Sequence, residues 1–246
     1  GAAAALAANL AGLRCVIYVP DEYQARRLPE MTRYDAEVVR APGGYEGAVE
    51  ASIEAASRQD WYDANPGGDN TALQLRAYGE IAREIYDDLR DAPAVVAVPV
   101  SNGTCLAGVY RGFQSLYRRG KTSRVPQMLA GSSYRQNPII AAYLSGADEC
   151  ADLDPAQIRE TGINEPLINW HSIDGDLALA GIRASGGWAD YASDRALSRY
   201  ARLLRDTQGL SVLPASTAGL HALLAQHAKT PLPADRYVAI LTGRKV

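Results

Sequence analysis

The chain has 246 residues, 47% of them apolar, and a formal net charge of −3 at pH 7. This apolar fraction supports a large buried core, and the weak acidity gives no electrostatic reason to expect a nucleic-acid partner or an anionic membrane surface. No apolar run approaches the roughly 20 residues of a membrane span, and the 3 cysteines and 3 histidines lack metal-ligand spacing. We therefore expect a cytoplasmic protein that binds no metal, nucleic acid or membrane.

The first part of the sequence alternates helical and strand-like patterns. In chain order it predicts a helix over 1–11, a strand over 14–19, a helix over 22–34, a strand over 36–40, a helix over 45–59 and the start of a short strand at Trp61-Tyr62. Apolar strands that alternate with helices of about 10–15 residues are typical of parallel sheets. The run Asn65-Pro66-Gly67-Gly68 interrupts this pattern, which places a domain boundary between residues 1–64 and 65–246.

The second part continues the alternation. It predicts helices over 71–89, 104–117, 137–144, 174–184 and 194–206, strands over 94–98 and 127–130, a second apolar helix that opens at 213–220, and a final strand over 238–243. Together the elements predict an α/β fold of open twisted sheets with helices on both faces.

The loop between strand 94–98 and helix 104–117 consists of small residues, Ser101-Asn102-Gly103-Thr104-Cys105. A strand, a small-residue loop and a helix together form the geometry that holds a phosphate, because the first amides of the helix and its dipole face the anion. The loop is neither G-x-G-x-x-G nor a Walker loop, and its only glycines here are Gly103 and Gly108, so a nucleotide-binding Rossmann protein is disfavoured. An ordinary tight turn is the alternative interpretation.

Several segments, taken in order, resemble the fold-type II pyridoxal-phosphate enzymes, which are similar to the tryptophan synthase β chain. They are the phosphate-type loop at 99–105, Leu213-Pro214-Ala215-Ser216-Thr217-Ala218 at the later helix, Leu241-Thr242-Gly243 at the last strand, and the alanine-rich helix and strand at 1–20. The match is best to the threonine synthase branch and spans nearly the whole sequence. The resemblance implies pyridoxal phosphate as cofactor and the fold class predicted above.

By position, the resemblance implies that the cofactor phosphate is bound by Ser101, Asn102, Gly103, Thr104 and Cys105. The family has glycine where this chain has Ser101 and Thr104, so phosphate binding here requires ordinary backbone dihedrals at both positions; their hydroxyls are possible additional donors. Cys105 is also a conceivable nucleophile, but no histidine lies in the motif to activate it.

Ser216 matches the hydroxyl residue that meets the pyridine nitrogen in this family. A hydroxyl partner leaves that nitrogen largely unprotonated, which suits β- and γ-elimination or replacement. The alternative interpretation of Ser216 is a helix N-cap, for which serine is well suited.

Other segments are weaker candidates. Asn65-Pro66 is similar to an Asn-Pro segment of the family, Ser132-Ser133 follows a strand at the carboxyl edge of the predicted sheet, and Asn169-Trp170-His171 is a candidate lining of the substrate pocket. His171 alone is better interpreted as a surface histidine.

The lysine that carries the cofactor as a Schiff base in this family has no counterpart here. The lysines are Lys121, Lys229 and Lys245, and none has a buried pattern, whereas a catalytic lysine must be desolvated or flanked by charge. We therefore expect no catalytic residue within this sequence and interpret it as part of a longer chain. The alternatives are a cleaved fragment and a non-catalytic binding protein that retains the fold.

As function, the resemblance implies a lyase or synthase that acts on an amino acid, similar to threonine synthase, which converts O-phosphohomoserine to threonine. Such a substrate needs a second phosphate site, for which Arg76 and Arg135 are the candidates. The alternatives are enzymes similar to cysteate synthase or to serine/threonine dehydratases. The family also implies a homodimer.

Overall fold

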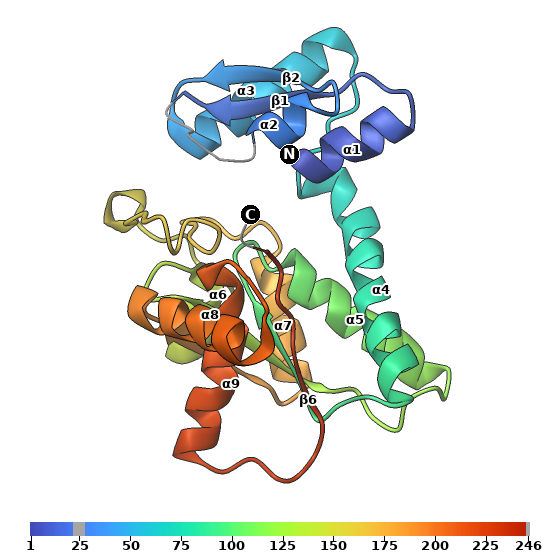
Figure 1. Cartoon of the computed structure of the whole chain (residues 1–246), viewed down its shortest axis with the longest axis vertical. Coiled ribbons are helices and arrows are strands. Elements are labelled where there is room, and N and C mark those ends of the chain that lie inside the picture. The colour runs from blue at the N-terminus through green and yellow to red at the C-terminus, as the bar shows by residue number, and fades with distance from the viewer. Residues whose placement is uncertain (22–27, 245–246) are drawn as a thin grey trace. The chain divides into compact units, whose positions relative to one another are not determined.

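The computed structural model describes residues 1–21 and 28–244. The chain divides into two compact units, Gly1–Asn65 and Pro66–Lys245, called here the N-terminal and the C-terminal unit (Figure 1). The fold class is α/β with parallel sheets, as the sequence predicts.

The N-terminal unit contains a two-stranded parallel sheet with helices beside it. Its elements are α1 (Ala2–Leu10), β1 (Val16–Pro20), α2 (Leu28–Thr32), β2 (Glu37–Ala41) and α3 (Gly44–Gln59). Ala5, Met31 and Ala36 form one small apolar cluster of this unit. The part of the predicted helix 22–34 that falls on 22–27 lies outside the described residues.

The short strand predicted at Trp61-Tyr62 is wrong, because neither residue lies in a strand. Helix α3 ends at Asp60 in the left-handed conformation (φ 54°), and the Trp61 amide donates back to the Ala56 carbonyl at 2.9 Å. Its indole ring instead lies beneath the Arg14 guanidinium, 4.7 Å from the ring centre. Aromatic residues favour strands, but the left-handed conformation at Asp60 turns the chain directly before this pair.

The C-terminal unit is built on a four-stranded parallel sheet in the order β5-β4-β3-β6. Its strands are β3 (Val95–Pro99), β4 (Gln127–Ser133), β5 (Trp188–Ala192) and β6 (Tyr237–Ala239). Its helices are α4 (Thr71–Leu89), α5 (Thr104–Arg118), α6 (Pro138–Ser145), α7 (Gly175–Ala184), α8 (Asp194–Gln208) and α9 (Ala218–Lys229), with short 3-10 turns η1 (Gly68–Asn70), η2 (Pro155–Gln157) and η3 (Pro214–Thr217).

Alternate residues of β3 serve the two faces of this sheet. Val96 and Val98 pack with side chains of α5, α6 and α7, including Phe113 and Ile182, whereas Val95 and Ala97 pack with Ala222 and Leu223 of α9. Helix α4 lies outside α5, as Figure 1 shows. Helices therefore cover both faces, and the strands are buried on both sides, as expected for a parallel sheet.

Two strands end three or more residues away from the predicted position, and one strand was not predicted. Strand β4 continues to Ser133, and β6 ends at Ala239 rather than 243. Strand β5, which the sequence did not predict, follows the glycine pair 186–187. A Cβ on Gly187 would lie 1.9 Å from the Met128 carbonyl oxygen, so glycine here lets the chain enter the sheet beside β4.

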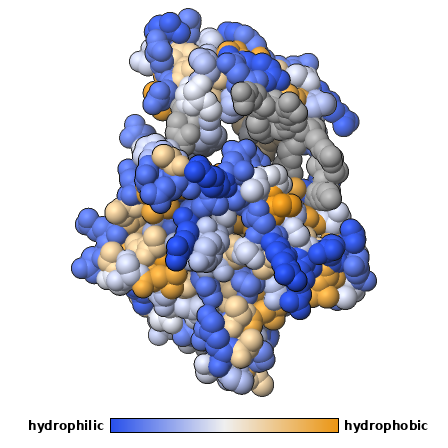
Figure 2. Space-filling view, turned by 90° about the vertical axis from the view of Figure 1, so that its left-hand side faces the viewer, coloured by the Kyte–Doolittle hydropathy of each residue, from blue (hydrophilic) through white to orange (hydrophobic). Residues whose placement is uncertain are grey.

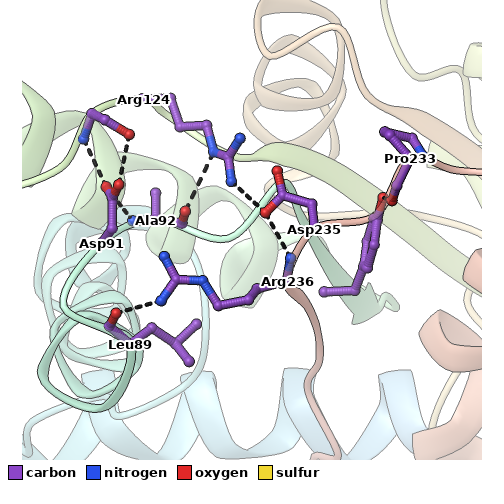
Figure 3. Close-up of polar contacts among 9 residues, drawn as sticks. Leu89, Asp91, Ala92, Arg124, Pro233, Asp235 and Arg236 are labelled. Carbon is purple, nitrogen blue, oxygen red and sulfur yellow. Dashed lines mark hydrogen bonds and ion pairs between the residues drawn. The ribbon is translucent and has the colours of Figure 1, made fainter.

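The amino ends of the strands are joined by polar contacts that Figure 3 displays. Asp91 accepts bonds from the Ser123 amide and hydroxyl, both at 2.7 Å, and Arg124 pairs with Asp235 at 2.7 Å. Hydrogen bonds from Ser123 lower the pKa of Asp91, and the Arg124 guanidinium lowers the pKa of Asp235. These contacts stabilise the edge of the sheet opposite to the phosphate-type loop.

The surface in Figure 2 mixes hydrophilic residues with separate, smaller apolar patches. Within 1–21 and 28–244, the structure contains no helix that is long and apolar enough to cross a bilayer. The same residues contain no group of three or more His, Cys, Asp or Glu side chains placed to hold a metal ion.

Candidate functional site

The loop after β3 lies at the carboxyl edge of the sheet, where ligands of open α/β sheets bind. Strand β3 ends at Pro99, and α5 begins at Thr104. The Val100 amide still donates to the Gly131 carbonyl of β4 at 2.9 Å, so the chain leaves the sheet at Ser101.

The backbone amides of residues 101–106 donate no hydrogen bond to any of the described residues. The Ala107 amide is the first one of α5 to find an acceptor, the Gly103 carbonyl at 3.0 Å. A run of consecutive free amides at the start of a long helix forms an anion-binding concavity, and the helix dipole adds to it.

The carbonyl groups of the same loop are bonded to side chains and backbone around it. The bonds run from Ser132 Oγ to the Val100 carbonyl (2.7 Å), from Asn137 Nδ2 and Ser172 Oγ to the Ser101 carbonyl (3.0 and 3.1 Å), and from the Asp174 amide to the Asn102 carbonyl (2.9 Å). The loop is therefore held by its acceptors while its donors remain free. This arrangement suits a phosphate, which offers only oxygens.

Gly103 is needed for this backbone. Its φ is 91°, and a Cβ here would lie 2.8 Å from the Asp174 carbonyl oxygen. Ser101 and Thr104 are not among the residues with positive φ, so the absence of the family's glycines at these positions does not strain the loop.

Thr104 contributes its amide but not its hydroxyl. The hydroxyl donates to the carboxylate of Asp174, which is 5% exposed and also accepts from the Thr71 hydroxyl at 3.1 Å. Because a hydroxyl has a single hydrogen, Thr104 has no second one for an anion. The additional donor considered for Thr104 is therefore absent in this structure.

Cys105 has the properties of a packing residue. Burial raises the pKa of its thiol to about 11, so the thiol remains protonated near neutral pH. It packs against the main core cluster. A nucleophilic cysteine needs a lowered pKa, and this environment does the opposite.

Ser216 lies in η3 and is 2% exposed. Its hydroxyl donates to the Gly243 carbonyl at 3.1 Å, and the Leu213 amide donates to the same carbonyl at 2.9 Å. The N-cap position of α9 belongs to Thr217, so the alternative interpretation of Ser216 as an N-cap is wrong. A hydroxyl that can turn away from Gly243 would serve a ring nitrogen as donor or acceptor.

Two glycines bring Ser216 to the same edge of the sheet as the loop. A Cβ on Gly219 would lie 2.8 Å from the Val98 amide nitrogen, and a Cβ on Gly131 would lie 2.1 Å from the Ala218 carbonyl oxygen. The start of α9 therefore lies directly on the backbones of β3 and β4. The loop at 101–105 and Ser216, which are far apart in sequence, both lie at the carboxyl edge.

The weaker candidates have different positions. Ser132 and Asn169 contact the loop, whereas His171 is exposed and pairs with Asp152 at 2.7 Å. Asn65-Pro66 lies where the two units divide, and its relation to the loop stays a prediction.

Asn137 and Asp174 belong to the site and were missed as such. In the sequence each is only a helix start, and their contacts with the loop depend on the tertiary fold. The one available signal is an Asn-Pro pair that begins a helix just past a strand, at the ligand edge of the sheet.

The chain is similar to known proteins over most of its length. A family model described as "Pyridoxal-phosphate dependent enzyme" matches residues 1–243. Threonine synthases of Methanocaldococcus jannaschii and Synechocystis are 27% and 30% identical to the chain, over 94% and 98% of it. The chain spans only 56% and 59% of these two relatives.

Solved structures resemble the chain in fold. Maize serine racemase superposes with a TM-score of 0.79 at 18% identity, over 100% of this chain and 70% of that one. The processed threonine deaminase isoform 2 of Solanum lycopersicum gives 0.81 at 15% identity, over 98% and 66%.

Proposed function

Because this chain belongs to the family of pyridoxal-phosphate dependent enzymes, we propose that it binds pyridoxal phosphate and forms part of a lyase or synthase that acts on an amino acid. The observation that carries the proposal is the run of free amides at 101–106, with the loop carbonyls bonded elsewhere. Together with the left-handed Gly103, it fits the phosphate of this cofactor.

Ser216 supports the second half of the cofactor site. It is a buried hydroxyl at the same sheet edge as the loop, and its one hydrogen-bond partner among the described residues is the Gly243 carbonyl. When bound, pyridoxal phosphate supplies an electron sink for the amino acid's carbanion, and a neutral hydroxyl at its ring nitrogen moderates that sink. The phosphate would be held by Ser101, Asn102, Gly103, Thr104 and Cys105 through their amides.

For the substrate, we favour chemistry like that of threonine synthase, with O-phosphohomoserine converted to threonine. This choice is supported by the threonine synthases among the relatives. The alternatives are reactions like those of cysteate synthase or of serine/threonine dehydratases; solved relatives include a threonine deaminase and an L-serine ammonia-lyase.

Arg135 is the better of the two candidates for the second phosphate of such a substrate. It follows the end of β4 at the carboxyl edge, is exposed, and has a φ of 57° with its guanidinium 5.3 Å from the Tyr134 ring centre. Arg76 is exposed on α4. A left-handed arginine at the ligand edge is an uncommon conformation, whereas an exposed helical arginine is ordinary.

The catalytic lysine is proposed to come from a longer form of the protein. Lys121 and Lys229 are exposed, Lys229 pairs with Asp190 at 3.1 Å, and Lys245 lies outside the described residues. As a competing proposal of another class, the chain acts as a binding protein without catalysis. A homodimer is proposed from the resemblance alone.

Cofactor binding is tested without any lysine chemistry. Pyridoxine phosphate and pyridoxine share the ring but have no aldehyde, and they differ in the phosphate. In calorimetric titrations of the chain we expect pyridoxine phosphate to bind at least about 100-fold more tightly, because the phosphate is the main contact. Equal affinities would overturn the phosphate site.

Catalysis is tested on the longest protein that the gene encodes. After incubation with pyridoxal phosphate and borohydride, its intact mass and peptide map are measured. A phosphopyridoxyl adduct on one lysine outside these 246 residues supports the enzyme. Absence of a specific adduct would favour the binding protein.

A further inference from the structure

Three asparagine side chains are joined end to end behind the phosphate-type loop. Asn137 Nδ2 donates to Asn169 Oδ1 at 3.0 Å, and Asn169 Nδ2 donates to Asn102 Oδ1 at 3.0 Å. They come from three places in the C-terminal unit: the N-cap of α6, the irregular connection between α6 and α7, and the loop itself.

The direction of this chain of amides is set at Asn137, which is fully buried. Its Oδ1 accepts from the amides of Ile139 and Ile140, at 3.1 and 3.3 Å. Backbone amides only donate, so the side-chain oxygen must lie on the helix side. The Nδ2 group therefore faces the loop and Asn169.

The orientation of Asn169 is fixed a second time by its own neighbours. Its Nδ2 also lies 2.9 Å from the His171 carbonyl oxygen, and a carbonyl only accepts. The Ser172 hydroxyl, 3.0 Å from this Nδ2, gives its own hydrogen to the Ser101 carbonyl. Both contacts require nitrogen, not oxygen, on the Asn102 side of Asn169.

The fixed orientation of Asn169 also fixes the orientation of the Asn102 side chain. Its Oδ1 is occupied by Asn169, and its Nδ2 donates to none of the residues in 1–21 and 28–244. Asn102 also belongs to the run of free backbone amides. A side-chain donor is thus added to backbone donors in a loop that we assign to an anion.

We propose that Asn137 and Asn169 are positioning residues that hold the Asn102 side chain with its NH2 group toward the bound phosphate. The backbone amides at the N-terminus of α6 fix the orientation of the Asn137 side chain, which fixes that of Asn169, which in turn fixes that of Asn102. The Asn102 NH2 group is thereby left as one further hydrogen-bond donor of the site. The proposal rests on the proposed phosphate site. It does not require catalysis.

The opposing view is that Asn169 only stabilises the irregular connection. A double-mutant cycle separates the two, because an orienting residue acts through its target. The variants are N102A, N169A and the double variant, and the readout is the ratio of dissociation constants for pyridoxine phosphate and pyridoxine. This ratio isolates the phosphate from the ring.

We expect N102A to lower the phosphate preference about tenfold, the worth of one hydrogen bond to a charged group. N169A is expected to lower it about fivefold in the wild-type chain and by less than twofold in the N102A background. We call the arrangement in which Asn137 and Asn169 orient Asn102 the relay. Equal effects of N169A in the wild-type and N102A backgrounds would show that Asn169 does not act through Asn102 and would overturn the relay.

Asn164 offers a matched control. It is a buried asparagine of the same connection that bonds to Ser133 and Arg159, and it makes no hydrogen bond to the described residues 101–105. N164A should lower the unfolding temperature and leave the phosphate preference unchanged. A loss of preference in N164A equal to that in N169A would also count against the relay.

If N169A does not fold, N169D replaces it, with N164D as its control. Aspartate keeps the size but offers oxygen to Asn102, whose NH2 group then turns toward it and leaves the ligand. We expect N169D to lower the phosphate preference at least as far as N102A does, and we expect N164D to leave it unchanged. If the wild-type chain shows no phosphate preference, the proposed function fails; if it does and the cycle is additive, only the relay fails.

Discussion

Gly131 of β4 lies against the carbonyl group of Ala218 so closely that a Cβ on Gly131 would come within 2.1 Å of that oxygen. The contact joins the sheet to the turn that carries Ser216. Because both partners are backbone, neither can be moved by a rotamer change.

Substitution of Gly131 by alanine is therefore expected to lower the free energy of unfolding by about 2 kcal/mol or more, as overpacked cores do. It should also weaken pyridoxine binding, because η3 must shift. Urea unfolding and titration measure the two effects. G162A is the control: a Cβ on Gly162 meets nothing within 4 Å, and a comparable loss there would contradict the packing argument.

Ser216 is expected to act on the ring and not on the phosphate. S216A removes the hydroxyl that now bonds to Gly243, so we expect affinity for pyridoxine phosphate to fall about tenfold while affinity for inorganic phosphate stays within about twofold. Calorimetry with both ligands measures this. A parallel loss for both would mean that Ser216 acts through the fold alone.

Cys105 is expected to be replaceable. Its amide, not its thiol, belongs to the site, so C105A should bind pyridoxine phosphate within about threefold of the wild type, with a stability cost of about 1 kcal/mol for the lost sulfur. The thiol, with a pKa of about 11, should alkylate slowly at pH 8 in the folded protein. Rapid alkylation protected by pyridoxine phosphate would contradict the assignment.

His221 is expected to make stability depend on pH. Burial lowers its pKa below the ordinary 6.5, against the opposing effect of Asp190, so near and below pH 6.5 the unfolded chain binds the proton more readily. The folded state therefore favours the neutral imidazole of His221. The contribution of this neutral side chain to the free energy of unfolding is fully present above pH 6.5 and is lost as the pH falls through the lowered pKa. Urea unfolding from pH 8 to 5 should give a shallower loss of stability in H221Q than in the wild type, and an equal loss in both proteins would contradict this role of His221.

Asp91 is expected to stabilise the far edge of the sheet without touching the site. Its lowered pKa means that the contribution is present above its ordinary value of 3.8 and is lost as pH falls below it. D91A should lower stability at pH 7 by about 1 kcal/mol, since the carboxylate is only partly buried and is screened by solvent. Its phosphate preference should equal that of the wild type, and unfolding at pH 7 and 3 should differ less in D91A than in the wild type.

Local patterns predicted the elements well where periodicity was long. The helix over 71–89 matches α4, and the start of α5 at Thr104 follows from the glycine before it. The resemblance named Ser101, Gly103 and Ser216 because their motifs are contiguous. Strand β5 escaped prediction because Asp190 interrupts its apolar pattern and because its entry depends on the contact of Gly187 with Met128.

The parts that sequence could not predict are the long-range contacts. Asp174 meets Thr104 across 70 residues, and Asn169 meets Asn102 across 67. Such pairs leave no periodic trace, since they depend on how α6 and α7 dock on the sheet. The strand, loop and helix pattern did predict free amides at the start of α5, but it could not show which side chains bind the carbonyl groups of the loop.

The order of strands also determines when the four-stranded sheet can be completed during synthesis. Strand β3, made in the middle of the chain, has on one side β4, which follows soon after it, and on the other β6, where Val95 pairs with Tyr237. Until those late residues leave the ribosome, the nascent chain carries β3 with one unpaired edge next to an unfinished loop. Such an edge is prone to pair with another chain, so we expect nascent forms that stop before Tyr237 to depend on chaperones.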